Sequence, residues 1–376
     1  IFIMNLNPSN NLNTEKNQLT LFSGLFSVFL IFYLIGLLDL PKSYSNLVFQ
    51  ARVFMSLSLI FLYLLTYKKL NLPKIMFYII PFSIYQFIFG FNKLYLDFNF
   101  LLILSVFFFN LRQYEKRIVL LFIAYFYLFI TSFIYFLDYF GLYQFKLVYF
   151  AGNIYSTLGF INQNGFSLIV FISMLIFWLL NKKISLIISA GLLVISFKQT
   201  DTRTTLYLMI ILIISTFIIY ILRFFKLNSI SFIYNISAFT VIYAIGIYLV
   251  VFADTLINKY SFLDSVLSKR LYFAIMELGK IKFINYVFGG QEVIIDSMYL
   301  NLIAQFGFIF MFVLYVVFVL AIYKLSIMKK DKYILLILTF FSFGIFEGLI
   351  STSSIFSILV FSFIFEAFPK AVTLKI

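Results

Sequence analysis

The chain has 376 residues, of which 64% are hydrophobic and 11% are charged, and its mean hydropathy is +1.07. These proportions exclude a soluble domain and predict an all-α polytopic membrane protein, since the alternating strands of about 10 residues that a barrel needs are not apparent. The formal charge of +14 does not indicate a nucleic-acid partner, because the cations are dispersed over short loops where anionic lipids attract them. The absence of Cys and His excludes disulfides, imidazole metal sites and a histidine base, so we expect neither a metal nor a cofactor.

Apolar stretches of membrane-spanning length follow one another along the whole chain. A bilayer core of about 30 Å needs about 20 apolar residues per helix. We expect about 12 transmembrane helices, several of them short, in a single transmembrane domain over residues 1–376. The predicted spans are 19–38, 47–67, 74–92, 94–110, 117–137, 158–180, 184–198, 204–222, 230–252, 297–323, 333–350 and 353–369.

Basic residues fall on alternate connections between these spans, and this alternation predicts the orientation. With the N-terminus inside, 17 of the 28 Lys and Arg lie on the cytoplasmic side. Of the other 11, five lie in one long external loop, which the positive-inside rule largely discounts. We therefore expect a protein of the cytoplasmic (inner) membrane with both termini in the cytoplasm. We expect no cleavable signal peptide, because the first span follows an Asn-rich tail without a small-residue cleavage site.

The long external loop, Ala253 to Asp296, connects spans nine and ten and is long enough to hold a folded element. Asp264 or Ser265 can cap a helix there. Apolar residues recur along that helix at helical spacing, so we expect it to be amphipathic and to lie on the outer membrane–water boundary. Its apolar face comprises Leu267, Leu271, Ile275 and Leu278.

Two arginines on the predicted outer side are candidates for anion binding. Arg203 lies where the eighth span begins, and a cation there opposes the helix dipole by about 0.3–1 kcal/mol unless an anion is present. A guanidinium beside free backbone N–H groups suits diphosphate oxygens. The alternative is that Arg203 pairs with Asp201 or a lipid phosphate. Arg270, next to Lys269 in the long loop, has a similar alternative, which is contact with lipid headgroups.

Carboxylates and amides on the same side are the other candidates. Asp296 opens span ten, and the polar residues Ser297, Asn301 and Gln305 follow it on one helix face, which should face a cavity or another helix rather than lipid. Glu347 lies in the outer half of span eleven, where a salt bridge with Arg52 is the structural alternative to catalysis. A further hydrogen-bonding group, Asn162-Gln163-Asn164-Gly165, lies at the outer end of span six.

These segments, in this order, resemble the O-antigen ligase and Wzy-type polysaccharide polymerase superfamily. The segment from Leu158 to Phe166 looks like its G-x-x-x-N-x-N start of a central span, and Thr202-Arg203-Thr204 is similar to its small-x-Arg turn one hairpin later. The basic external loop then leads into Phe288-Gly289-Gly290. Asp296-Ser297-Met298-Tyr299-Leu300, followed by Gln305-Phe306-Gly307, matches the D/H-x-x-Y-L and x-x-G segments that open the next span. The matched segments cover about residues 158–350, and the late Glu347 belongs to the same pattern.

The resemblance implies a glycosyltransferase that uses an undecaprenyl-diphosphate-linked glycan at the outer face of the membrane. It implies that Arg203 and Arg270 bind the diphosphate, that Asn164 and Tyr299 also bind substrate, and that Asp296 or Glu347 takes the proton of the attacking sugar hydroxyl. Ligases carry a His where Asp296 stands, which favours a repeat-unit polymerase over an O-antigen ligase. The implied partners are the lipid-linked oligosaccharide, membrane lipids and a chain-length regulator.

A lipid-linked oligosaccharide flippase, or another transporter, is the main alternative function. Transporters need polar groups along a path through both leaflets. In this chain the candidate residues cluster on the predicted outer side and the inner halves of the spans are nearly uncharged, which favours chemistry at the outer face.

Overall fold

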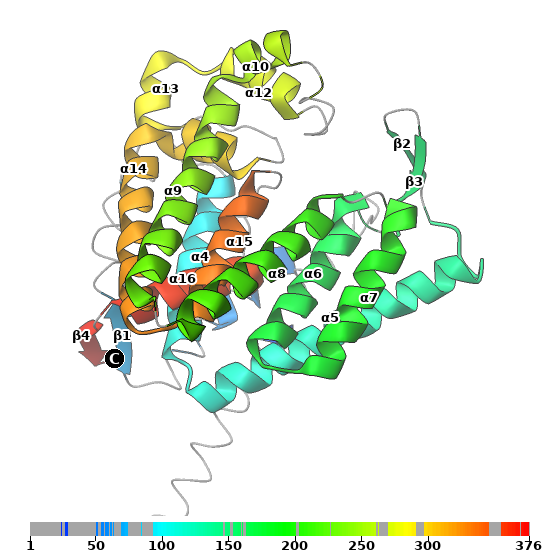
Figure 1. Ribbon diagram of the computed structural model, residues 1–376, viewed down its shortest axis with the longest axis horizontal. Helices are drawn as coiled ribbons and strands as arrows, with labels where there is room; N and C mark the ends of the chain where they lie inside the picture. The colour runs from blue at the N-terminus through cyan, green and yellow to red at the C-terminus, as the bar shows by residue number, and fades with distance from the viewer. Residues whose placement is uncertain are drawn as a thin grey trace, which may run out of the picture. The chain divides into compact units, whose positions relative to one another are not determined.

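The computed structural model describes most of the chain from residue 93 onward and scattered positions before it (Figure 1). The predicted spans 19–38, 47–67 and 74–92 lie outside the described residues apart from isolated positions. The described residues are 24, 27–28, 50–51, 54–55, 57–59, 61, 63, 69–73, 84, 93–145, 147–150, 153–158, 160, 163–200, 203–225, 227–260, 262, 270–290, 297–345, 355–368 and 370–375.

Within this part of the chain, a helix stands at the position of every predicted span from the fourth to the twelfth. The described helices α5, α8, α9 and α14 are long and apolar enough to cross a membrane, whereas α4, α6, α7 and α16 are apolar over shorter lengths. A helical membrane protein is therefore supported, and the number of spans remains a prediction. The bounds are α4 Lys93–Asn110, α5 Gln113–Tyr139, α6 Gln163–Leu179, α7 Lys183–Thr200, α8 Arg203–Phe224, α9 Asn228–Val251, α14 Met298–Ile327, α15 Asp331–Gly344 and α16 Ile355–Ala367.

Short strands are also present, which the sequence reading did not predict. Strand β1 (Lys69–Pro73) pairs with β4 (Lys370–Lys375), and β2 (Leu147–Phe150) pairs antiparallel with β3 (Asn153–Ser156) as a hairpin. The hairpin lies between the fifth and sixth predicted spans, and its β-branched and aromatic residues favour a strand. The sixth predicted span is longer than the helix observed there, because α6 begins at Gln163 rather than near residue 158.

The described helices group into two compact units, and the first contains α5, α6, α7 and the β2–β3 hairpin. Helix α6 packs against both α5 and α7, and it is buried almost throughout because it is apolar on all sides. The Tyr125 ring of α5 lies 5.0 Å from that of Phe177 on α6. On α7, Ile184 and Ile187 remain 77% and 70% exposed, as expected for side chains that face lipid.

The second unit contains α4, α8, α9, α14, α15 and α16, together with the short helices between α9 and α14. Helices α15 and α16 are its interior and are almost fully buried. Helix α4 joins them through its rings, with Phe98 5.0 Å from Phe306 of α14 and Phe109 6.2 Å from Phe365 of α16. Apolar helices without a polar face thus pack inside, while α8 keeps an exposed apolar side that includes Phe217 and Tyr220.

Polar contacts hold one end of this second unit together. Arg223 in the last turn of α8 forms a bidentate pair with Asp331, the first residue of α15, at 2.8 and 3.0 Å. Asn235 near the start of α9 donates to Ser326 near the end of α14, at 3.2 Å. The ends of α8, α9, α14 and α15 therefore alternate between two sides, as consecutive spans must.

A second ion pair lies at that same end. The Lys330 ammonium is 2.9 Å from the carboxylate of Glu366, close to the C-terminal end of α16. Lys330 directly precedes Asp331, so this pair joins the α14–α15 connection to the last turn of α16. The opposite end of the unit carries the start of α14, the end of α15 and the start of α8.

Candidate functional site

The N-terminal part of α14, residues 298–306, is buried in the second unit. The predicted polar stripe lies on it: Ser297 is the N-cap, its hydroxyl accepts from the Leu300 N–H at 3.4 Å, and Asn301 and Gln305 follow one and two turns on. The three residues are 6%, 4% and 1% exposed. The expectation that this stripe avoids lipid is therefore confirmed.

Gln305 is the most unusual member of the stripe. Both atoms of its side-chain amide are buried without a hydrogen-bond partner among the described residues. A buried amide left unpaired costs about 1–3 kcal/mol, so such a group ordinarily meets a water or a ligand. It offers one donor group and one acceptor, which is the combination that a hydroxyl or a water satisfies.

Tyr299 is a packing residue in the described structure, and its predicted role in substrate binding remains a prediction. It is fully buried, and its hydroxyl donates to the Phe341 carbonyl of α15 at 3.3 Å. That carbonyl is among the last four of α15, which lack partners within the helix. The Tyr299 ring lies 5.6 Å from that of Tyr243 on α9 and against Gly246, where a Cβ would overlap it. Sequence reasoning missed Tyr243 and Gly246, because neither stands out in an apolar helix.

Helix α14 is broken at Gly307, where φ is 76° and ψ is 169°. The break brings it against the Gly289-Gly290 turn: the Gly290 N–H donates to the Gln305 carbonyl at 2.9 Å. A Cβ on Gly307 would lie 2.6 Å from the Gly289 nitrogen, so neither position has room for a side chain. The turn therefore satisfies a carbonyl beside the break, as irregular backbone inside an apolar protein requires.

Two short helices, α12 (Arg270–Leu278) and α13 (Phe283–Phe288), lead into that turn. The Tyr286 hydroxyl of α13 donates to the Leu278 carbonyl of α12 at 2.8 Å, and its ring stacks 6.4 Å from that of Phe308 on α14. Burial raises the pKa of the Tyr286 phenol above its ordinary value, which keeps it protonated as a donor.

The predicted loop helix is thus present, and its predicted apolar face is partly buried against the protein, with Leu271 buried and Ile275 and Leu278 half-buried. Leu271 is 2% exposed, because α12 packs on α9 and on α10 (Ala253–Lys259). We expected that face on the membrane surface. The predicted cap, Asp264 or Ser265, lies outside the described residues.

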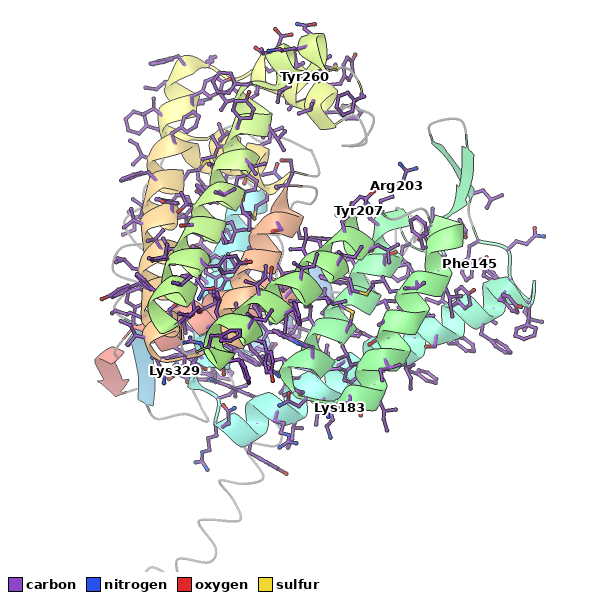
Figure 2. All side chains as sticks on the ribbon, in the orientation of Figure 1. Phe145, Lys183, Arg203, Tyr207, Tyr260 and Lys329 are labelled. Carbon is purple, nitrogen blue, oxygen red and sulfur yellow. The ribbon has the colours of Figure 1, made fainter. Side chains whose placement is uncertain are left out.

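Arg203 is the first residue of α8, one residue before the predicted start of the eighth span. Its side chain is exposed, and Figure 2 shows it projecting beyond the end of the helix, one turn above Tyr207. The position beside the first N–H groups of α8 suits an anion. Asp201, its alternative partner, lies outside the described residues.

The other predicted site residues are less completely described. Arg270 begins α12, but its side chain is outside the described part, as are Asp296, Glu347 and Arg52. The helix ends that lead to the two carboxylates are in contact: a Cβ on Gly344 of α15 would lie 2.8 Å from the Met298 sulfur of α14. Convergence of Arg203 and Arg270 on one cavity remains a prediction.

Asn164 belongs to the first unit, in the first turn of α6, and its side chain is half-buried. Its neighbours pack tightly, since a Cβ on Gly165 would lie 3.0 Å from Phe160, whose ring is 5.9 Å from that of Phe166. The residues that carry the resemblance here therefore include a close packing contact, and a substrate-binding role for Asn164 remains a prediction.

No group of three or more acidic side chains that could hold a metal ion is found in the described part of the chain. Comparison with protein-family models, with curated proteins and with solved structures finds no match for this chain.

Proposed function

We propose that the protein is a polysaccharide repeat-unit polymerase, a membrane glycosyltransferase that transfers an undecaprenyl-diphosphate-linked glycan to a sugar hydroxyl at the outer face of the cytoplasmic membrane. The observation that carries the proposal is the backbone contact between Gly289-Gly290 and Gln305–Gly307. These two segments were singled out separately on sequence resemblance, and they meet beside the polar stripe of α14.

The alternation of helix ends in the second unit supports a site on one side. Arg223 pairs with Asp331 at one end, so the opposite ends of α8 and α15, which carry Arg203 and lead to Glu347, point to the other side. The contact of Met298 with Gly344 adds the start of α14, next to Asp296, to that side. In our proposal this side is extracytoplasmic.

The proposed reaction is a displacement at the anomeric carbon of the lipid-linked sugar. The acceptor hydroxyl oxygen forms the new glycosidic bond while the bond from that carbon to the diphosphate oxygen breaks. Asp296 or Glu347 takes the hydroxyl proton, and undecaprenyl diphosphate leaves with the bonding electron pair. Arg203 and Arg270 stabilise the negative charge that develops on the diphosphate. The buried Gln305 amide, a member of the polar stripe, supplies hydrogen-bonding capacity for water or hydroxyl groups.

The membrane arrangement that accompanies this proposal has about 12 spans, cytoplasmic termini and the loop Ala253 to Asp296 outside. The pairing of β1 with β4 supports it, because β1 follows the second predicted span and β4 follows the last, and both belong to predicted cytoplasmic segments. The lipid-linked oligosaccharide is the proposed substrate, and a chain-length regulator is the proposed protein partner.

Replacement of Arg203 tests the proposal. A bidentate guanidinium contact cannot be replaced by an ammonium, so loss of one such contact should cost about 3–4 kcal/mol, or a rate reduced about 10²–10³-fold, by analogy with a deleted oxyanion donor. In cells that carry Arg203→Lys or Arg203→Ala, long polysaccharide should collapse to single repeat units on the lipid carrier at unchanged protein level. Normal chain lengths would refute the role of Arg203.

Helix α8 provides the matched control, because its second arginine, Arg223, stands at the opposite end and pairs with Asp331. Arg223→Lys should preserve long polymer. The location of the accumulated repeat unit separates the alternatives. Single units exposed outside indicate a polymerase, units retained inside indicate a flippase, and long polymer left on the lipid carrier indicates an O-antigen ligase.

A further inference from the structure

The outer sides of α12 and α13 carry large apolar side chains that are exposed. On α13, Phe283 is 82% exposed, Ile284 56% and Phe288 39%. No residue of this helix is buried. On α12, Tyr272 and Met276 are 51% and 47% exposed, on the side opposite the buried Leu271. Exposed apolar surface of this extent calls for a partner.

These helices are fixed to α14 by several contacts. Tyr286 joins α13 both to the Leu278 carbonyl of α12 and to the Phe308 ring, and the Gly290 N–H bonds to the Gln305 carbonyl. Figure 1 shows α13 standing on the end of the straight part of α14, with α10 and α12 at the same end of α9. Their height relative to the spans is therefore set by the structure.

That height can be derived from the length of α14. Its straight part, residues 308–327, is about 30 Å long at about 1.5 Å per residue, which matches the hydrocarbon core of a bilayer. The C-terminal end of this straight part carries Lys324 and is followed by Lys329. Figure 2 labels Lys329 at the end of the unit remote from α13. Gly307 then lies at the opposite boundary of the hydrocarbon core. Helix α13 ends at Phe288, next to Gly289, which contacts Gly307, so α13 lies at this boundary as well.

We propose that α13 and the adjoining end of α12 lie in the lipid headgroup layer, with Ile284 and Met276 in contact with the lipids. The composition fits that layer, where aromatic rings and lysines gather: Lys280 and Lys282 flank the apolar residues. The lipid-contacting face is the exposed side of α12, opposite the face that the sequence pattern indicated. The inference depends on α14 crossing the membrane and not on the proposed glycosyl transfer.

The single tryptophan, Trp178, makes a fluorescence test straightforward. In the full-length protein with Trp178→Phe, one tryptophan is introduced at a time and the purified protein is reconstituted into phosphatidylcholine–phosphatidylglycerol vesicles. The acyl chains carry bromine either near the glycerol or near the chain end. The test variants are Ile284→Trp and Met276→Trp. The references are Phe312→Trp, 66% exposed within the straight part of α14, and Asn258→Trp on a polar, exposed site of α10.

We expect both test variants to lose emission more strongly with shallow than with deep bromine, and Phe312→Trp to show the reverse order. Quenching of both test variants by aqueous iodide alone, as for a residue in water, would overturn the proposal. Quenching by neither would overturn it too, because the face would then be covered by protein, for example by a second copy of the chain. Either result leaves the polymerase assay with Arg203 unaffected, so the two proposals can fail separately.

Discussion

Gly307 and Gly289 approach each other so closely that a Cβ on Gly307 would lie 2.6 Å from the Gly289 nitrogen. Both residues also adopt backbone conformations essentially confined to glycine, with φ of 76° and 80° and ψ near ±160–170°. The break in α14 and the turn after α13 therefore depend on each other. Together they fix the short buried part of α14, which carries the polar stripe.

Gly307→Ala should destabilise the protein by at least about 1–3 kcal/mol, because the strained conformation alone costs that much before the overlap is counted. We expect a lower apparent Tm of the purified protein in detergent, followed by intrinsic fluorescence. Gly191→Ala is the matched control: Gly191 lies within α7 with open space around it, and alanine there should stabilise the helix by about 0.5–1 kcal/mol. Equal effects of the two changes would contradict the close contact.

Tyr299→Phe should separate packing from substrate binding. The change leaves the ring in place and removes its hydrogen bond to the Phe341 carbonyl, so it should cost about 1–3 kcal/mol of stability, toward the lower value because the bond is long at 3.3 Å. Polymer length should be unchanged when the protein level is matched. Shortened polymer at normal stability would support the predicted role of Tyr299 in substrate binding.

The positions of most helices could be predicted because hydropathy is a local signal. The start of α8 at Arg203 was placed to within one residue. The break at Gly307 could not be predicted, because a single glycine in an apolar run is compatible with a continuous helix. The break depends on the backbone of Gly289, which arrives from the preceding loop.

The pairing of β1 with β4 and the orientation of α12 could not be predicted for the same reason, which is their dependence on distant segments. Pairing of β1 with β4 joins segments near opposite ends of the chain, and no local pattern encodes it. For α12, the spacing of Leu271 and Leu278 indicated an apolar face correctly. Whether such a face meets lipid or protein depends on the neighbours, here α9 and α10. The sequence could nominate candidate site residues by their chemical type, whereas their contacts could not be predicted.

The pair Arg223–Asp331 should contribute about 1 kcal/mol, the upper range for a partly exposed pair, because its geometry is bidentate. Either alanine variant should lower the apparent Tm. The exchange Arg223→Asp with Asp331→Arg should recover only part of the lost stability. It places a negative charge at the C-terminal end of α8 and a positive charge at the N-terminal end of α15, and both interact unfavourably with the helix dipoles. A double variant no better than the single ones would show that the two side chains do not pair.

Cysteine labelling of this Cys-free chain tests the proposed sides of the membrane. Asn258→Cys on α10 should react with an impermeant maleimide on intact spheroplasts. Lys329→Cys, exposed at the α14–α15 connection, should react only after permeabilisation. Asn258 follows the C-terminal end of α9 and Lys329 follows the C-terminal end of α14. These two helices run in opposite directions, so each position serves as the control for the other. The reverse pattern would invert the topology and place the proposed site on the cytoplasmic side.

The choice between Asp296 and Glu347 as the base can be made with the isosteric amides. Asp296→Asn and Glu347→Gln keep the shape of the side chain and remove its capacity to take a proton. Loss of a general base should slow polymerisation about 10²–10⁴-fold, measured with purified protein and lipid-linked repeat units. Only the variant at the base should show this loss while still binding the donor, whereas the other should change the rate much less. If both amide variants polymerise at the normal rate, neither carboxylate is the base, and the hydroxyl proton must leave by another route.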